Sequence, residues 1–114
     1  MSKLEERPWG SYEVLLDTNI TKVKQIIVKP GQRLSYQYHD KRAESWTLVQ
    51  GLGLITIDDT AIEIGAGNSF FIPEKAKHRI ANIGEEDLIF IEVQLGEYFG
   101  EDDIVRIEDD YSRE

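Results

Sequence analysis

Hydrophobic and polar residues alternate in short stretches along most of this chain. A period of two is typical of β-strands with one buried face, and glycine, proline, asparagine and aspartate residues separate the stretches. No stretch combines a sustained helical period with caps at both ends. The pattern therefore predicts an all-β sandwich or barrel. The expected strands cover residues 10–16, 21–29, 32–39, 44–50, 54–57, 60–64, 69–72, 78–82 and 88–95, and residues 104–107 could add a last one.

The alternation also sorts side chains onto the two faces of each expected strand. Residues i and i+2 point the same way, so Lys24 lies on the face of Ile26, and Glu92 lies on the face of Phe90. Residues 32–39 are unusual because their polar face lies opposite a largely aromatic one. If the aromatic residues pack, the polar set lines a cavity or faces solvent. The polar set is Arg33, Ser35, Gln37 and His39, and the opposite set is Leu34, Tyr36 and Tyr38.

Length and composition predict one globular domain spanning residues 1–114. We expect an irregular arm at about 1–10 and an acidic segment at about 96–114, with Trp9 covering apolar surface. The chain has no cysteine, no run of about 18 apolar residues that could span a bilayer, and no apolar leader. A cytoplasmic protein is the expectation.

The formal net charge of −9 argues against a nucleic acid or an anionic membrane as partner, since both attract positive charge. A phosphorylated substrate is still compatible, because the charge is unevenly distributed. Much of the acid lies near the C-terminus, whereas basic residues gather around the stretches that carry the two histidines. These basic residues are Lys22, Lys24, Arg33, Lys41, Arg42, Lys75, Lys77 and Arg79.

The candidate chemistry is a metal site made by Gln37, His39, Glu44 and His78. Gln37 and His39 share a strand face, and Glu44 joins them if the chain reverses near residues 40–41. Imidazole and carboxylate are good ligands for divalent zinc, manganese, iron, cobalt or nickel, and this set leaves positions open for water or substrate. A lone histidine is more often an ordinary polar residue. Two histidines in the two most punctuated stretches favour the metal.

These residues resemble the two motifs of the cupin superfamily. The first, G-x5-H-x-H-x4-E-x6-G, matches residues 31–51 with Gln37 at the first histidine position. The second, G-x5-P-x-G-x2-H-x3-N, matches residues 67–82 with Lys75 at the middle glycine. The resemblance implies the cupin double-stranded β-helix, a jelly-roll-like β-barrel, with a divalent metal ion as cofactor.

A narrower resemblance covers nearly the whole chain. The stretches at residues 7–15, 23–39, 42–46, 72–82 and 91–111 are similar to the C-terminal domain of type II mannose-6-phosphate isomerases, where glutamine is common at the first ligand position. The resemblance implies interconversion of mannose 6-phosphate and fructose 6-phosphate through an enediol. These 114 residues do not include the guanylyltransferase domain that usually precedes this domain, so we expect no GDP-mannose synthesis from them. Ser45 and residues 40–41 stand where relatives often have histidine, which puts substrate preference in question.

The resemblance and the alternation together suggest roles for residues around the metal. Ser35 and Arg42 also resemble positions in the distantly related type I isomerases, where the serine contacts phosphate and the basic residue lies beside the reacting carbons. Alternation adds Lys24 and Arg33 as substrate-binding candidates and Glu92 as a catalytic candidate. Arg79, which follows a ligand, could lie at the barrel mouth and act in catalysis. Which residue transfers the proton stays open.

Two rival functions fit the same residues. One is a cupin that binds a sugar or nucleotide sugar without isomerising it, and the other is a different metal-dependent cupin enzyme. A domain that keeps the site only as a relic is a third possibility. A homodimer is expected, because closing exposed strand edges favours pairing, and the arm around Trp9 could contribute.

Overall fold

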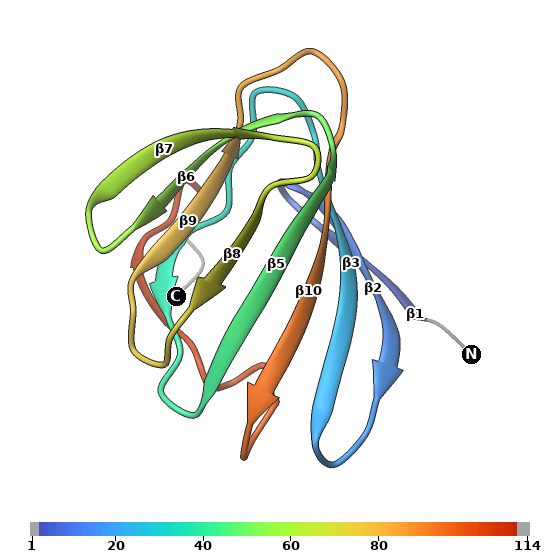
Figure 1. The fold of residues 1–114 in the computed structure, drawn as a ribbon, viewed down its shortest axis with the longest axis vertical. Coiled ribbons are helices and arrows are strands. Elements are labelled where there is room, and N and C mark those ends of the chain that lie inside the picture. Colours follow the sequence, from blue (N-terminus) through green and yellow to red (C-terminus); the bar gives the residue numbers. More distant parts are fainter. Residues whose placement is uncertain (1–2, 112–114) are drawn as a thin grey trace.

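Two antiparallel β-sheets face each other in the computed structural model, which describes residues 3–111 (Figure 1). One sheet has the strand order β1-β2-β3-β10-β5-β8, and the other has the order β11-β4-β9-β6-β7. The described residues form no helix, and so none that could cross a membrane. The all-β prediction is confirmed. The strands are β1 (Lys3–Arg7), β2 (Gly10–Asp17), β3 (Thr21–Val28), β4 (Tyr36–Tyr38), β5 (Arg42–Gln50), β6 (Leu52–Ile57), β7 (Thr60–Gly65), β8 (Ser69–Ile72), β9 (His78–Asn82), β10 (Leu88–Gly96) and β11 (Val105–Glu108).

The expected irregular arm is wrong for residues 3–7, which form β1 and pair with β2 in a register that sets Arg7 opposite Gly10. The turn lets Trp9 enter the core, where it is 6% exposed, as expected. Gly10 is required there because a β-carbon would lie 2.0 Å from the carbonyl oxygen of Ile27. The predictions for residues 1–2 and 112–114 lie outside the described residues.

The expected strand at residues 32–39 is shorter than its alternation suggested. Only residues 36–38 form β4, and the preceding residues touch β9 at an isolated bridge between Arg33 and Ala81. Leu34 and Ser35 are both buried although they are consecutive, so the alternation is broken at this point. This irregular stretch decides which of the predicted polar residues reach the cavity described below.

The core lies between the sheets and changes from apolar to polar at Trp46. The Trp46 ring stacks on Phe90 at 4.4 Å between centroids and presents its edge to His78 at 5.6 Å. Burying polar groups is unfavourable unless they find partners, so such a cluster indicates a functional site. The buried polar side chains are Lys24, Ser35, Gln37, His39, Arg42, Glu44, His78, Arg79, Asn82, Glu92 and Gln94.

Candidate metal centre

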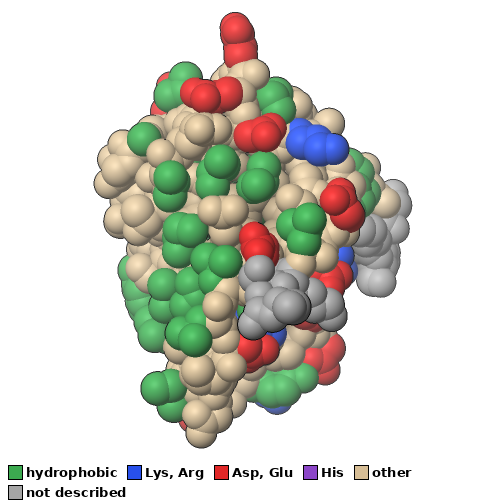
Figure 2. Space-filling view, turned by 90° about the vertical axis from the view of Figure 1, so that its right-hand side faces the viewer, with side chains coloured by type: hydrophobic (Ala, Val, Ile, Leu, Met, Phe, Trp, Pro, Cys, Tyr) green, Lys and Arg blue, Asp and Glu red, His purple; other side chains and the backbone are tan. Residues whose placement is uncertain are grey.

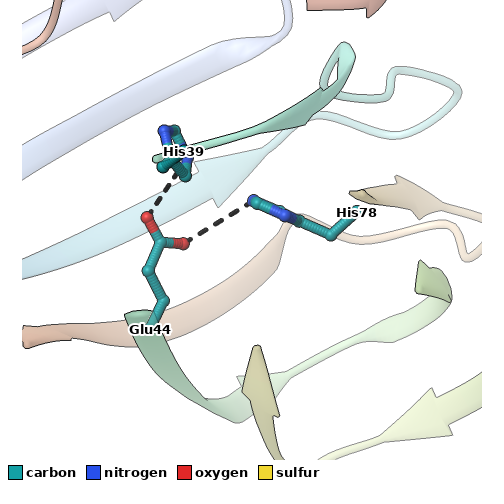
Figure 3. A group of neighbouring side chains, drawn as sticks. All are labelled: His39, Glu44 and His78. Carbon is teal, nitrogen blue, oxygen red and sulfur yellow. Dashed lines mark ion pairs between the residues drawn. The ribbon is translucent and has the colours of Figure 1, made fainter. Parts of the chain in front are cut away.

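His39, Glu44 and His78 point toward one another between the two sheets (Figure 3). His39 directly follows β4, Glu44 lies on β5, and His78 begins β9. Glu44 lies between the imidazoles, with Oε2 3.3 Å from Nε2 of His39 and Oε1 3.8 Å from Nε2 of His78. One potential ligand atom from each residue lies within 4.8 Å of the others. The sequence prediction that two distant histidines and Glu44 converge is therefore matched by the geometry.

Backbone carbonyl groups orient both imidazoles. Nδ1 of His39 donates to the carbonyl oxygen of Asp103 at 2.7 Å, and Nδ1 of His78 donates to that of Ala76 at 3.0 Å. This assignment of the ring proton leaves each Nε2 as a lone pair directed at Glu44. Desolvation lowers the pKa of His39, which favours its neutral, ligating form. Nε2 of His78 is buried and has no hydrogen-bond partner among the described residues.

The Glu44 carboxylate is held in its ionised form. Burial alone would raise its pKa, but the interactions with His78, Arg42 and His39 and the hydrogen bond from Trp46 outweigh desolvation, and the pKa lies at about 2. Nε of Arg42 donates to Oε2 at 2.8 Å, and Nε1 of Trp46 donates to Oε1 at 2.9 Å. Glu44 is thus a fixed, negatively charged candidate ligand at neutral pH.

This donor set fits a divalent transition metal. Two imidazole nitrogens and one carboxylate suit zinc, manganese, iron, cobalt or nickel, and they leave coordination positions free. The orphaned Nε2 of His78 is an independent sign, because an unpaired buried acceptor costs stability that a bound ion would restore. Gln37 pairs with His78 across β4 and β9, is 8% exposed and borders the same cavity. Its role as the fourth ligand stays a prediction.

A cavity of about 80 Å³ adjoins this centre, and four further predicted residues line it. They are Ser35, Lys24, Arg42 and Glu92, all buried. Arg42 reaches the centre itself, because its Nη2 donates to Nε2 of His39 at 3.3 Å while its Nη1 has no partner within the described chain. A cationic donor in the cavity wall is thus available to a ligand.

Arg33 and Arg79 do not line the cavity. The Arg33 guanidinium forms two hydrogen bonds with the Asp110 carboxylate, at 2.7 and 2.8 Å, on the exposed surface. Arg79 donates from Nε to the carbonyl oxygen of Leu34 at 2.8 Å and from Nη1 to Glu108 at 2.6 Å. The broken alternation before β4 explains Arg33. The hydrogen bonds of Arg79 join the irregular stretch to β11. The geometry therefore gives no support to the expected substrate role of Arg33 or the expected catalytic role of Arg79.

Glu92 has a chemically useful environment. It is 4% exposed, and burial together with the nearby Glu44 charge raises its pKa to about 7. Nε2 of Gln94 donates to its Oε2 at 2.5 Å. A carboxyl group that exchanges its proton near neutral pH is suited to general acid–base chemistry.

The sequence reasoning missed the contribution of the C-terminal segment. Glu101, Ile104 and Arg106 line the cavity, and Asp103 orients His39. No alternation marks residues 97–103, so no pattern could have placed Glu101 and Asp103. Ile104 and Arg106 belong to the stretch 104–107, which was expected as a possible last strand but not as part of the site. Trp46 could have been found, because it lies two residues after Glu44 and therefore on the same strand face.

Comparison with known proteins identifies the family. The family model described as "Mannose-6-phosphate isomerase C-terminal" matches residues 2–109. This chain belongs to that family. The alginate biosynthesis protein AlgA of Pseudomonas aeruginosa is 49% identical over 107 residues, which are 94% of this chain and 22% of AlgA. A mannose-1-phosphate guanylyltransferase of Sinorhizobium fredii is 40% identical over 95% of this chain and 21% of its own length.

The chain therefore spans about a fifth of the length of these two relatives. Among solved structures, an uncharacterized Klebsiella pneumoniae protein with a double-stranded β-helix domain superposes with a TM-score of 0.74. It is 24% identical, and the match covers 84% of this chain and 77% of that one. The likeness confirms the cupin-type fold class that the two motifs predicted.

Proposed function

We propose that this chain is a metal-dependent aldose–ketose isomerase that interconverts mannose 6-phosphate and fructose 6-phosphate. The observation that carries the proposal is the buried group of His39, Glu44 and His78 beside a cavity that both basic and acidic side chains line. Membership of the mannose-6-phosphate isomerase C-terminal family supplies the substrate class. The relatives' names include alginate biosynthesis and guanylyltransferase functions, which concern proteins several times longer.

The metal ligands would be Gln37, His39, Glu44 and His78, with the identity of the metal open among zinc, cobalt, manganese, nickel and iron. When bound, a divalent ion orients the sugar oxygens and stabilises negative charge that develops during formation of the enediol. Arg42 would add to this stabilisation through Nη1, its unpartnered and buried donor. A fixed donor in a cavity wall stabilises developing charge without reorganisation.

Glu92 would move the proton between the two adjacent sugar carbons. Its pKa of about 7 lets it accept a proton and return it near neutral pH. Glu92 reaches the cavity from β10, next to β5, which carries Arg42 and Glu44. We therefore assign Glu92 as the base, Arg42 as the electrostatic partner, and Ser35 and Lys24 as substrate-binding residues.

A coupled assay for fructose 6-phosphate, run with mannose 6-phosphate and each divalent metal in turn, tests the proposal. We expect turnover only with metal, and loss of both bound metal and turnover in His78→Ala. With the metal at saturating concentration, Arg42→Met should lose roughly 100-fold or more in kcat, the usual size for one electrostatic donor. Bound metal is measured in parallel, because Arg42 also donates to the Glu44 carboxylate. Normal turnover in Arg42→Met would remove Arg42 from the mechanism.

The same assay separates the rival functions. Saturable sugar-phosphate binding without product would indicate a binding cupin that does not isomerise its ligand. Conversion of a different sugar phosphate, or oxygen uptake with ferrous iron, would indicate another metal-dependent cupin enzyme. Either outcome, obtained with metal loaded, would overturn the proposed reaction.

A homodimer is also part of the proposal. On four neighbouring strands of the six-stranded sheet, β3, β10, β5 and β8, the side chains that point outward carry no charge. In Figure 2, hydrophobic side chains gather on the left-hand side of the picture. That side of the molecule faces the viewer in Figure 1. We propose this face, in place of the strand edges first expected, as the contact between two copies. The expected cytoplasmic location and the absence of nucleic-acid and membrane partners stay predictions.

A further inference from the structure

Two lysines of β3 fasten the C-terminal segment beside the cavity, which Lys24 and Glu101 line and Lys22 does not. Nζ of Lys24 lies 2.7 Å from Oε2 of Glu101, and Nζ of Lys22 lies 3.8 Å from the same oxygen. Nζ of Lys22 also donates to the carbonyl oxygen of Phe99 at 3.1 Å. Glu101 is separated from Lys24 by 77 positions in the sequence, so the contact is purely tertiary.

The two sides of this ion pair differ sharply in exposure. Lys24 is 4% exposed, and its ammonium lies 4.2 Å from the centroid of the Tyr12 ring. The Glu101 side chain is 51% exposed and belongs to a turn that precedes β11. A buried ammonium requires an anion, whereas a half-exposed carboxylate can leave for water at modest cost. The lysines are therefore the fixed part of the site, and Glu101 is the replaceable part.

Glu101 is ionised at neutral pH. Partial desolvation raises its pKa, but the charge and hydrogen bond of Lys24 outweigh this and leave the pKa below its usual value. A carboxylate in this position presents oxygen acceptors to two ammonium groups. A phosphate group presents three oxygens and more negative charge, so it satisfies the same donors better.

We propose that Lys22 and Lys24 form an anion subsite which Glu101 fills in the free protein, and that the phosphate group of the substrate replaces Glu101 there. This inference rests on the proposed function for the identity of the ligand. Because a neutral sugar cannot displace the carboxylate from two lysines, Glu101 makes the cavity selective for phosphorylated sugars. Glu101 is thus a specificity residue, although it contributes no bond to the bound substrate.

Binding of inorganic phosphate to the metal-free protein tests the subsite without any turnover. Isothermal titration calorimetry at fixed ionic strength would compare the wild type with Glu101→Gln. Removing a competing carboxylate whose pairing is worth about 1 kcal/mol should tighten phosphate binding roughly fivefold. Lys24→Met should weaken binding at least as much.

Glu97→Gln is the matched control, because it makes the same change of charge at an exposed position of the same segment. It should bind phosphate as the wild type does. Equal phosphate affinity in Glu101→Gln and Glu97→Gln would overturn the inference, and so would unchanged binding in Lys24→Met. If Lys24→Met fails to fold, the phosphate affinities of Lys22→Met, Glu101→Gln and Glu97→Gln still test the subsite.

The outcomes separate this inference from the proposed reaction. Tighter phosphate binding in Glu101→Gln together with no isomerase activity would keep the anion subsite and reject the isomerase. Isomerase activity, together with unchanged phosphate binding in Glu101→Gln, would support the isomerase and reject the anion subsite. In an active enzyme, the same variant should also lower the KM for mannose 6-phosphate relative to Glu97→Gln.

Discussion

At the scale of single residues, the candidate site is marked by buried polar atoms that have no hydrogen-bond partner among the described residues. Within the described residues, Nη1 of Arg42, Nε2 of His78 and Nε of Arg106 are buried nitrogens without hydrogen-bond partners. Each such atom costs roughly 1–3 kcal/mol relative to a paired one. Arg42 and Arg106 line the cavity, and His78 lies at the metal centre. A bound ion would give His78 a partner, and oxygen acceptors would give partners to the two arginines.

Glu92 predicts a pH dependence of stability. Its pKa is about 7 in the folded protein, above the usual value of 4.5, so the folded state holds a proton that the unfolded state has lost. Stability should therefore fall as pH rises from about 4.5 to 7, by roughly 3 kcal/mol at most. Urea unfolding of the metal-free protein at several pH values measures this loss. Glu92→Gln should lose markedly less stability over the same range.

Gln94→Glu is not a suitable comparison, because it would add a second buried carboxyl beside Glu92. Glu13→Gln on β2 is a better control, since the change in charge is the same and the side chain lies outside the cavity. It should retain the full pH dependence of the wild type. Parallel pH profiles for Glu92→Gln and the wild type would show that Glu92 ionises normally.

At the scale of elements, the segment between β10 and β11 completes the metal centre. The Asp103 carboxylate accepts hydrogen bonds from the backbone amides of Asp40 and Lys41 at 3.0 and 2.9 Å. Its backbone carbonyl oxygen accepts the Nδ1 proton of His39. The segment is thereby joined to the turn that follows β4, and it fixes the orientation of one ligand.

Asp103→Ala should therefore weaken metal binding while the fold persists. Losing the two amide bonds frees the segment, so the carbonyl group no longer holds His39, and a loss of roughly tenfold in zinc affinity is expected. A competition titration with a zinc chelator measures it. Asp102→Ala is the control, because the Asp102 carboxylate contacts the Tyr98 hydroxyl outside the site. Equal zinc affinity in both variants would contradict the positioning role.

The same elements show what the sequence could and could not predict. Alternation placed β3 and β10 correctly and put Lys24 and Glu92 on inward faces. The spacing of the two motifs predicted that His39 and His78 lie close together, although they belong to different halves of the chain, and both imidazoles lie beside Glu44. Arg33 was misplaced, because the backbone before β4 leaves the regular strand geometry at which alternation holds. Glu101 and Asp103 were missed because a turn held by long-range contacts carries no local period.

At the scale of the whole molecule, a strongly acidic chain keeps one broad face free of charge. The net charge is −9, and the outward positions of β3, β10, β5 and β8 are hydrophobic or uncharged. Two acidic copies repel each other least where neither brings charge, and an isologous contact uses the same face on both. A second copy of the chain is thus the occupant that this face fits best. Its outward residues are Val23, Gln25, Ile27, Ala43, Ser45, Thr47, Val49, Ser69, Phe71, Ile89, Ile91, Val93 and Leu95.

Val49→Lys should convert the proposed dimer into a monomer. Val49 is 53% exposed on β5, and an isologous interface would bury the new charge twice, which should weaken dimerisation at least tenfold. Sedimentation velocity across a range of concentrations measures the shift. Leu52→Lys makes a similar change at a side chain that is 56% exposed but lies on β6 of the other sheet, so it should stay dimeric. A monomeric wild type, or equal dimerisation of the two variants, would show that this face does not bind a second copy.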